Sequence, residues 1–255
     1  MSQNDLEGRV AIVTGASRGI GSAIADALAE RGARVVLSSR KQPDLDAEAE
    51  RINSVHPGAA LAVAAHAGRP EDLARLVQAT LDHFGRIDIL VNNAATNPYF
   101  GHTVDADLSH WDKTFEVNVR GVFALTQLAV HRYMGEHGGA IVNVASVGGV
   151  RVAFGLGIYN ITKAAVIHMT KQLALELGPK GIRVNAVAPG LIKTRFAEAL
   201  WGNEEILKRV LESTALGRIG SPSEIGKVVA FLASDDASYL TGEVVVIDGG
   251  GGAGH

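Results

Sequence analysis

The stretch "RVAIVTGASRGIGSAIADALAERGA" (residues 9–33) passes from an apolar run through a glycine turn into a helical pattern. Its first six residues are rich in Val and Ile, which is typical of a strand covered on both faces. Gly15, Gly19 and Gly21 follow. Over 19–31, apolar residues recur at intervals of three and four, the period of an amphipathic helix. A strand, turn and helix in this order predict the first unit of a parallel α/β sheet.

The same alternation continues along the chain. Further strands are predicted at 33–38, 60–65, 86–91, 139–145, 181–188 and 242–248. Helices are predicted at 44–55, 70–84, 109–134, 157–178 and 222–233, the last beginning at a capping box of Ser221 and Glu224. Such alternation implies right-handed crossovers. The predicted fold is therefore a single doubly wound Rossmann-type α/β domain, residues 1–255, with a seven-stranded parallel sheet.

Residues 189–221 break this rhythm. Their sequence "TRFAEALWGNEEILKRVLES" predicts two short helices, and excursions of this length are often lids or binding loops. Ligands of doubly wound sheets bind beyond the carboxyl ends of the strands. We therefore expect a substrate-binding lid over 189–221. The glycine-rich end, 249–255, is expected to be flexible.

Composition excludes several classes of function. The 255 residues contain no Cys, which excludes disulfides, thiolate metal sites and cysteine nucleophiles, and no metal site is expected. A formal charge of −3 gives no reason to expect nucleic acid as a partner. The start "MSQNDLEGRV" is unlike a secretory signal, and no apolar run approaches the ~20 residues of a membrane span. A cytoplasmic protein without a membrane partner is expected.

The glycine turn has two alternative interpretations besides a simple turn. Glycines between a strand and a helix let the backbone approach a pyrophosphate at the helix N-terminus, which predicts a dinucleotide site. The segment "GASRG" (15–19) also matches the nucleophile elbow of hydrolases, with Ser17 as the nucleophile. That mechanism needs a later Asp and His, and the only late His is His255 in the tail. The hydrolase is the less favoured alternative.

The residues about twenty positions further on decide which dinucleotide is expected. An NAD site usually has an acidic side chain there, whereas this chain has "SSRK" (38–41). Ser39 and Arg40 can bind a 2′-phosphate, and Arg18 in the glycine turn can approach the same group. NADP is therefore expected rather than NAD, unless Arg40 is only a solvated loop charge.

The segment "YNITK" puts Tyr159 and Lys163 one helical turn apart. Such a pair can be a surface accident. It can also be catalytic, because a cation ~4 Å from a phenolate stabilises it by about 4 kcal/mol at an effective dielectric near 20. In that case the pKa of the tyrosine is expected to be lowered.

Taken together, these residues resemble the short-chain dehydrogenase/reductase family over essentially the whole chain. The matching motifs are "TGASRGIG" (14–21), "NNAA" (92–95), Asn118, Ser146, "YNITK" and "PGLIKT" (189–194). Segments such as "SSRKQ" and "WDKTFEVNV" resemble a branch of NADPH-dependent reductases of carbonyl compounds and retinal. The resemblance implies an NADP(H)-dependent oxidoreductase that interconverts a carbonyl compound and its alcohol by hydride transfer.

The family resemblance also implies catalytic roles. Tyr159 would be the proton donor, with Lys163 shifting its pKa, and Ser146 would bind the carbonyl oxygen. Asn118 would serve a water-mediated proton relay through a local distortion of its helix. The alternatives are a turn serine and a surface or capping asparagine.

Binding residues follow from the same resemblance and the glycine turn. The cofactor is expected to contact Gly15, Ser17, Arg18, Gly19, Ile20, Gly21, Ser39, Arg40, His66, Ala67, Asn92, Ala94, Tyr159, Lys163, Pro189, Gly190, Ile192 and Thr194. The substrate is expected to contact Ser146, Phe154, Tyr159, Phe196 and Trp201, although the aromatic residues could equally be core. Two positions depart from the family pattern: Ala95 replaces a glycine, and His66 stands where an Asp commonly contacts adenine.

The sequence is also compatible with two alternative functions, and it predicts an oligomeric assembly. A 3-oxoacyl carrier-protein reductase shares the motifs, and a non-catalytic NADP-binding regulator would keep the cofactor site without turnover. The helices at 109–134 and 157–178 carry apolar residues on more than one face, and the family pairs them between subunits. A homotetramer acting on a small carbonyl or alcohol substrate is therefore expected.

Overall fold

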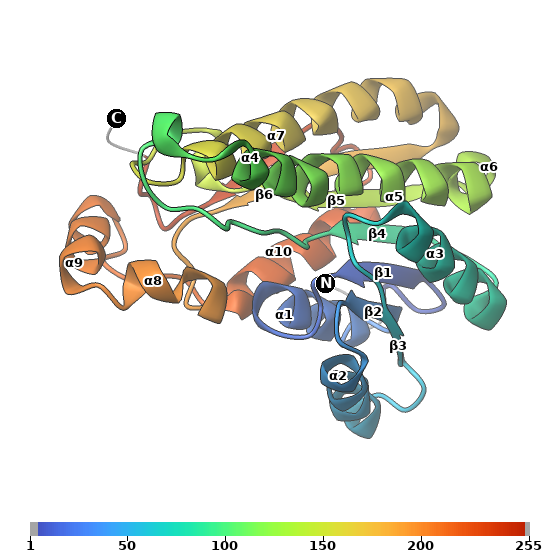
Figure 1. Cartoon of the computed structure of the whole chain (residues 1–255). Helices are drawn as coiled ribbons and strands as arrows, with labels where there is room; N and C mark the ends of the chain where they lie inside the picture. Colours follow the sequence, from blue (N-terminus) through green and yellow to red (C-terminus); the bar gives the residue numbers. More distant parts are fainter. Residues whose placement is uncertain (1–4, 253–255) are drawn as a thin grey trace.

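The computed structural model describes residues 5–252. Its centre is a seven-stranded sheet in the order β3-β2-β1-β4-β5-β6-β7, with every neighbouring pair parallel (Figure 1). The strands are β1 (Val10–Thr14), β2 (Arg34–Ser39), β3 (Ala60–Ala64), β4 (Ile89–Asn92), β5 (Gly139–Val144), β6 (Ile182–Pro189) and β7 (Val244–Ile247). The predicted fold class is confirmed, and each strand overlaps its predicted range.

Helices cover both faces of the sheet (Figure 1). One face carries α1 (Gly19–Ala29), α2 (Gln42–Val55) and α10 (Pro222–Ala233). The other carries α3 (Pro70–Phe84), a long helix over 108–137, and α7 (Gly157–Leu177). Short 3₁₀ turns occur at Thr103–Asp105, Val147–Gly149, Gly178–Lys180, Arg195–Ala197 and Asp235–Ala237.

The long helix is not regular. It consists of α4 (Leu108–Phe115), a π-helical turn (Glu116–Arg120), α5 (Gly121–Ala129), a second π-helical turn (Val130–Met134) and α6 (Gly135–His137). Each π turn widens the helix locally, which such turns often do at functional sites. The first π turn carries Asn118, in agreement with the distortion implied by the family resemblance.

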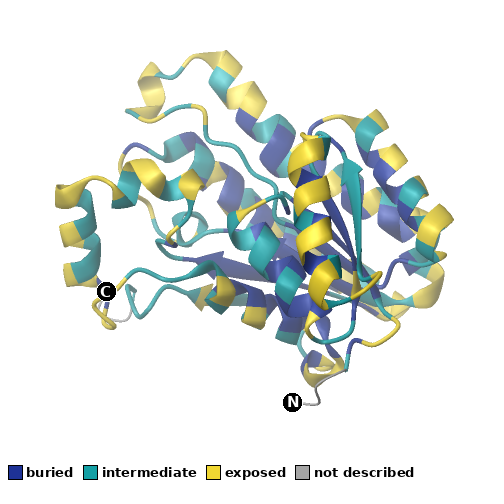
Figure 2. Ribbon diagram, turned by 90° about the horizontal axis from the view of Figure 1, so that it is seen from below, coloured by how far each residue is buried: buried dark blue, intermediate teal, exposed yellow. Residues whose placement is uncertain are grey.

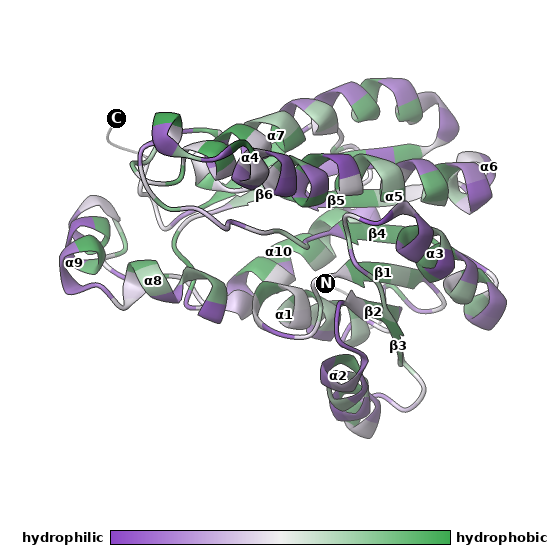
Figure 3. Ribbon diagram, in the orientation of Figure 1, coloured by the Kyte–Doolittle hydropathy of each residue, from purple (hydrophilic) through white to green (hydrophobic). Residues whose placement is uncertain are grey.

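The continuous apolar runs reflect burial on both faces. Adjacent β1 residues Ile12 and Val13 are both fully buried, but Val13 packs with α1, α2 and α10, whereas Ile12 packs on the α3 and α5 side. Figure 2 shows the buried strands and the exposed outer faces of the helices. Figure 3 shows the matching hydropathy, apolar in the sheet and polar on the outer helix surfaces. Strands without a solvent face need no polar alternation.

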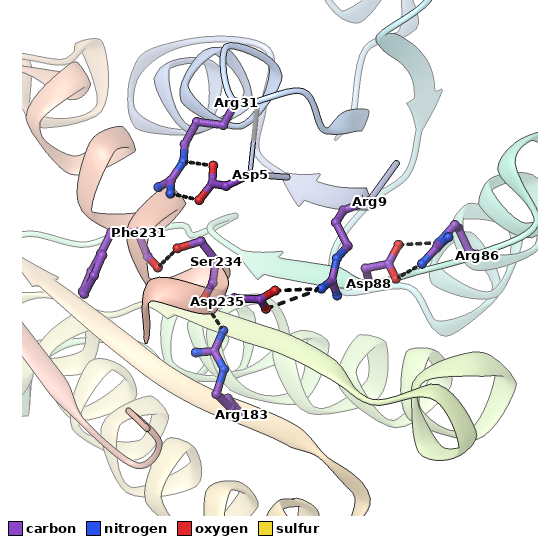
Figure 4. Close-up of polar contacts among 9 residues, drawn as sticks. All are labelled: Asp5, Arg9, Arg31, Arg86, Asp88, Arg183, Phe231, Ser234 and Asp235. Carbon is purple, nitrogen blue, oxygen red and sulfur yellow. Dashed lines mark hydrogen bonds and ion pairs between the residues drawn. The ribbon is translucent and has the colours of Figure 1, made fainter. Parts of the chain in front are cut away.

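Paired charges hold the amino-terminal ends of the strands together (Figure 4). Asp88, just before β4, accepts a 2.8 Å hydrogen bond from the backbone N–H that opens β1 and pairs with Arg86. Arg183 on β6 donates to the carbonyl oxygens of Leu232 and Ser234, both at 2.8 Å. It thereby binds carbonyls that the end of α10 leaves without helical partners. These charged side chains connect segments of the fold at the end of the sheet opposite the candidate site.

The predicted lid leaves the sheet after β6. It contains α8 (Glu198–Trp201) and α9 (Glu204–Ser213), which project from one end of the molecule (Figure 1). Ile192 and Gly220 form a bridge that joins the two ends of this excursion. The two short helices predicted there are confirmed.

The end of the chain is partly described. Arg151 pairs with Asp248 at 2.5 Å and donates to the carbonyl of Gly251. The rest of the predicted flexible tail, residues 253–255, lies outside the described residues. Within 5–252, no helix is long and apolar enough to cross a membrane, and no group of three or more His, Asp and Glu side chains could hold a metal ion.

Candidate active site

A glycine cradle lies at the carboxyl end of β1. A Cβ atom on Gly15 would lie 2.8 Å from Asn93 Nδ2, and one on Gly21 would lie 2.2 Å from the carbonyl oxygen of Gly15. Gly15 and Gly19 also have positive φ angles, 66° and 62°. Only glycine fits this backbone, which therefore stays open to a ligand at the start of α1.

The predicted loop after β6 meets this cradle. A Cβ atom on Gly19 would lie 3.4 Å from Thr194 Cγ2, so the two predicted cofactor segments are in contact. Gly190 lies against the backbone of Asp248, and Ile192 is 5% exposed and packs in the core. Pro189 ends β6 and is buried, whereas Ser17, Ile20, Ala67 and Ala94 are half-buried around the turn.

Two residues that were not among the predicted contact residues, Thr14 and Asn93, hold the cradle in place. Thr14 Oγ1 accepts hydrogen bonds from the backbone N–H groups of Asn93 and Ala94, both at 3.0 Å. Asn93 Nδ2 in turn donates to the carbonyl oxygen of Thr14 at 2.8 Å. Both residues lie in the motifs "TGASRGIG" and "NNAA", but their contact could not be predicted from the sequence, because the pairing of β1 with β4 is a tertiary feature.

The side chain of Asn92 lies in the interior, unlike that of the adjacent Asn93, which contacts the glycine cradle. Its side chain is buried and donates to Asn143 Oδ1 at 2.9 Å and to Thr126 Oγ1 at 3.2 Å. Asn143 donates onward to Thr170 on α7. The Asn92 side chain thus joins β4, β5 and the helices above them, and its predicted contact with the cofactor stays a prediction.

Beside the cradle, two positively charged side chains stand just before α1 and just after β2. Arg18 and Arg40 are exposed and take part in none of the ion pairs formed within residues 5–252. Ser39, the half-buried last residue of β2, lies beside them in sequence. His66 comes next in space, since the preceding Ala65 donates to the carbonyl of Ser39 at 2.8 Å.

Tyr159 and Lys163 lie together on α7. Lys163 is 3% exposed, its Nζ atom lies 5.5 Å from the centroid of the Tyr159 ring, and it donates to the carbonyl of Val144 at 2.7 Å. Burial lowers the pKa of Lys163 to about 8. Burial also raises the pKa of Tyr159 to about 12, while a hydrogen bond with Ser146 acts in the opposite direction.

The pKa of Tyr159 is shifted upward, whereas the sequence predicted a lowered pKa. The physical reason is desolvation, which penalises the phenolate and here exceeds the favourable hydrogen bond. In the chain alone, Tyr159 therefore keeps its proton at neutral pH. Ser146 lies next to it at the end of β5, where its Oγ atom also accepts from Gly148 N at 3.1 Å.

Asn118 is buried under the same helix. Its Oδ1 atom accepts from the backbone N–H of Thr96 at 2.8 Å, and its Nδ2 atom donates to Thr162 Oγ1 at 3.1 Å. Thr162 Oγ1 donates to the carbonyl of Tyr159 at 2.7 Å. The side chain, 1% exposed, is therefore not a surface asparagine, and Thr96 and Thr162 are partners that the sequence did not indicate.

The predicted aromatic wall is only partly assembled. The Phe196 ring lies 6.1 Å from the Tyr159 ring and is well exposed. Phe154 is also exposed and meets His102 edge to face at 4.9 Å. Trp201 Nε1 donates to the carbonyl of Thr194 at 2.8 Å, so this residue anchors the excursion. Phe196 is the aromatic residue that the structure brings to Tyr159.

Comparison with known proteins agrees with this geometry. A family model described as Enoyl-(Acyl carrier protein) reductase matches residues 15–251. Dehydrogenase/reductase SDR family member 4 of Sus scrofa is 44% identical over 248 residues, covering 96% of this chain and 88% of the relative. The chain belongs to the short-chain dehydrogenase/reductase family. It is an oxidoreductase of the CH–OH/C=O class.

Other members of the short-chain dehydrogenase/reductase family are similar in sequence and fold. The human dehydrogenase/reductase SDR family member 4 is 42% identical, covering 98% of this chain and 90% of the relative. A short-chain type dehydrogenase/reductase from Mycobacterium marinum has a TM-score of 0.91 at 36% identity, over 97% of both chains. A gluconate 5-dehydrogenase from Burkholderia cenocepacia, solved with NADP and tartrate, has a TM-score of 0.93 at 29% identity, over 98% of this chain and 97% of that one.

The buried charge of Lys163 should make stability depend on pH. Its pKa is lower in the folded protein, about 8, than the ordinary 10.5, so the penalty is complete below pH 8 and fades as the pH rises toward 10.5. Lys163→Met should stabilise the fold at pH 7 by about 2 kcal/mol, after allowance for the lost bond to Val144. Denaturant unfolding at pH 7 and pH 10 should show this advantage shrinking with pH. Lys171→Met, on the exposed side of α7, is the control and should change little; a destabilised or pH-independent Lys163→Met would contradict the expectation.

Proposed function

We propose that this protein is an NADP(H)-dependent reductase that interconverts a ketone or aldehyde and its alcohol. The observation that carries the proposal is the gathering of Ser146, Tyr159 and Lys163 beside the glycine cradle, with Asn118 buried behind them. The chain's own donors fit a nicotinamide dinucleotide. The cradle has no room for side chains and lies at the N-terminus of α1, near the exposed Arg18 and Arg40.

In this mechanism the cofactor, when bound, supplies a hydride to the carbonyl carbon. The Tyr159 hydroxyl donates the proton that the developing alkoxide requires. Its raised pKa keeps this proton on the hydroxyl at neutral pH until the alkoxide, a far stronger base, develops. The Ser146 hydroxyl donates a hydrogen bond to the same oxygen, where negative charge accumulates. The Lys163 ammonium stabilises the phenolate that remains. Asn118 keeps the first turn of α7 in place through Thr162.

Tyr159→Phe should abolish reduction and leave the cofactor bound. The ring and its packing remain, but the proton donor is removed, which should lower kcat by at least 10²–10⁴-fold. Steady-state kinetics with NADPH and a panel of ketones and aldehydes, together with NADPH affinity, measure both effects. Tyr133→Phe, whose ring stacks on His137 instead, should keep full activity. Retention of more than about a tenth of wild-type turnover by Tyr159→Phe would remove this residue from its role.

The same assay separates the alternative functions. A family model named for a carrier-protein substrate matches the chain, so a 3-oxoacyl thioester on its carrier protein belongs in the substrate panel. Faster reduction of the thioester than of every simple carbonyl compound would identify a carrier-protein reductase. Binding of NADPH without turnover of any substrate would instead indicate a non-catalytic regulator.

NADP is proposed as the cofactor because the end of β2 carries Arg40 and Ser39 and no carboxylate. Arg40→Asp replaces attraction of a 2′-phosphate by repulsion and should weaken NADPH binding by roughly 10–100-fold, with a smaller effect on NADH. Fluorescence titration with both reduced cofactors provides the measurement. Lys180→Asp makes the same change of charge before β6, at the far end of the sheet, and should have no effect. Tighter binding of NADH than NADPH by the wild type would contradict the proposal.

We also propose a homotetramer, with the cytoplasm as its compartment. Exposed apolar side chains on α4, α5 and α7 support the assembly, namely Trp111, Phe123, Ile161 and Leu175. Burying them against a second copy would remove apolar surface from water. Light scattering at micromolar concentration should give the mass of four chains of 26.7 kDa. A monomeric mass would overturn the assembly without affecting the proposed chemistry.

A further inference from the structure

The turn after β5 connects Ser146 to Arg151. Ser146 caps the 3₁₀ turn Val147–Gly149, and the backbone N–H of Arg151 donates to the carbonyl of the first residue of this turn at 2.8 Å. A Cβ atom on the last glycine of the turn would lie 2.6 Å from the backbone carbonyl carbon of Lys163, so the turn lies directly on α7. The position of Ser146 therefore depends on that of Arg151.

The side chain of Arg151 reaches the turn that follows β7, residues 248–251, which we call the β7 turn. One terminal nitrogen of the guanidinium lies 2.5 Å from Asp248 Oδ2, and the other donates to the carbonyl of Gly251. The second carboxylate oxygen of Asp248 accepts from Gly250 N at 3.0 Å. Charge-assisted hydrogen bonds of this kind are stronger than neutral ones. Arg151 thus fixes the loop after β5 to the β7 turn.

The β7 turn also holds both ends of the excursion that carries α8 and α9. At the start of the excursion, a Cβ atom on Gly190 would lie 2.9 Å from Asp248 Cα, so the two backbones are in close contact. Near its end, the backbone N–H of Leu216 donates to the carbonyl of Gly249 at 3.0 Å. A single short segment therefore contacts Arg151 on one side and the base of the excursion on the other.

We propose that Arg151 is a positioning residue for the reaction, which ties the turn that begins at Ser146, through Asp248, to both ends of the excursion. The inference rests on the proposed function, in which the Ser146 hydroxyl donates to the carbonyl oxygen of the substrate. Such a donor contributes to catalysis only where it is fixed against the developing charge, and a displacement of about 1 Å can cost much of the rate. The serine and the excursion are thereby held in one arrangement.

A second ion pair of the same chemistry provides the contrast. Arg9 pairs with Asp235 at 3.3 Å at the opposite end of the sheet (Figure 4). The two arginine side chains are almost equally exposed, 37% for Arg151 and 38% for Arg9, but Asp248 is 10% exposed and Asp235 is 81% exposed. Exposed ion pairs contribute little to the structure that they connect. Arg9 is therefore the matched control for Arg151.

Steady-state kinetics of Arg151→Met test the positioning role. Methionine keeps an apolar side chain in the loop and removes the guanidinium. Because Ser146 acts on charge that develops in the transition state, the variant should lower kcat roughly ten-fold, with little change in the KM of the carbonyl substrate or in NADPH affinity. Arg9→Met should keep the kcat of the wild type.

A double-mutant cycle identifies Asp248 as the partner. Asp248→Asn should also lower kcat, and the double variant with Arg151→Met should be about as slow as Arg151→Met alone, because both changes break the same connection. Fully additive losses would overturn the inference. So would an unchanged kcat in Arg151→Met, or a loss confined to KM.

Amide hydrogen exchange of the intact protein tests the connection without turnover. Arg151→Met should speed exchange both in a peptide spanning 146–151 and in one spanning 214–220, while peptides from α3 keep the wild-type rate. Arg9→Met should leave all three regions unchanged. Faster exchange in the first peptide alone would overturn the inference. Absence of turnover by the wild type would overturn the proposed function, and with it the role in the reaction, whereas the exchange result would still decide whether Arg151 connects the two segments.

Discussion

The candidate site depends on the close contact between the backbone of residue 15 and the segment that follows β4. Gly15 and Gly21 have no room for a Cβ atom, because Asn93 Nδ2 and the Gly15 carbonyl oxygen occupy that space. Thr14 and Asn93 hold the contact together with hydrogen bonds of 2.8–3.0 Å. The start of α1, with its unsatisfied N–H groups, is thereby fixed at the carboxyl edge of the sheet, the edge at which ligands of doubly wound sheets bind.

The two ionisable groups of the proposed chemistry, Tyr159 and Lys163, are buried here at a cost to stability. Lys163 is buried and pairs with no carboxylate among residues 5–252, and burial shifts its pKa and that of Tyr159 in the directions that disfavour both charged forms. The cost is tolerated because a large α/β domain buries two extensive apolar layers around the sheet. Perturbed ionisable groups of this kind are typical of functional sites, where local stability is given up for reactivity.

The first π turn carries two side chains that contact different segments of the chain. Asn118 on this turn reaches Thr96 and Thr162 near the tyrosine, while Glu116 on the same turn lies against Gly68 and pairs with Lys113. A regular helix advances its side chains by 100° per residue, whereas the wider turn changes which residues face inward. One local irregularity therefore sets the direction of two side chains, Asn118 toward the tyrosine of the proposed chemistry and Glu116 toward the loop after β3.

The sequence by itself determined the elements, because period and capping are local properties. All seven strands, the two short helices after β6 and the capping box, in which Ser221 N donates to Glu224 at 2.8 Å, were predictable from neighbouring residues alone. The Tyr159–Lys163 spacing was equally predictable, since residues four apart share a helix face.

Tertiary structure decided what depends on the surroundings of each side chain. It directed Asn92 into the interior and Trp201 to Thr194, and it raised the pKa of Tyr159 where the spacing alone suggested a lowered value. The hydrogen-bond partners of these side chains, and the segments that shield them from water, are distant in sequence. The local pattern of residues does not predict which distant segments will be in contact.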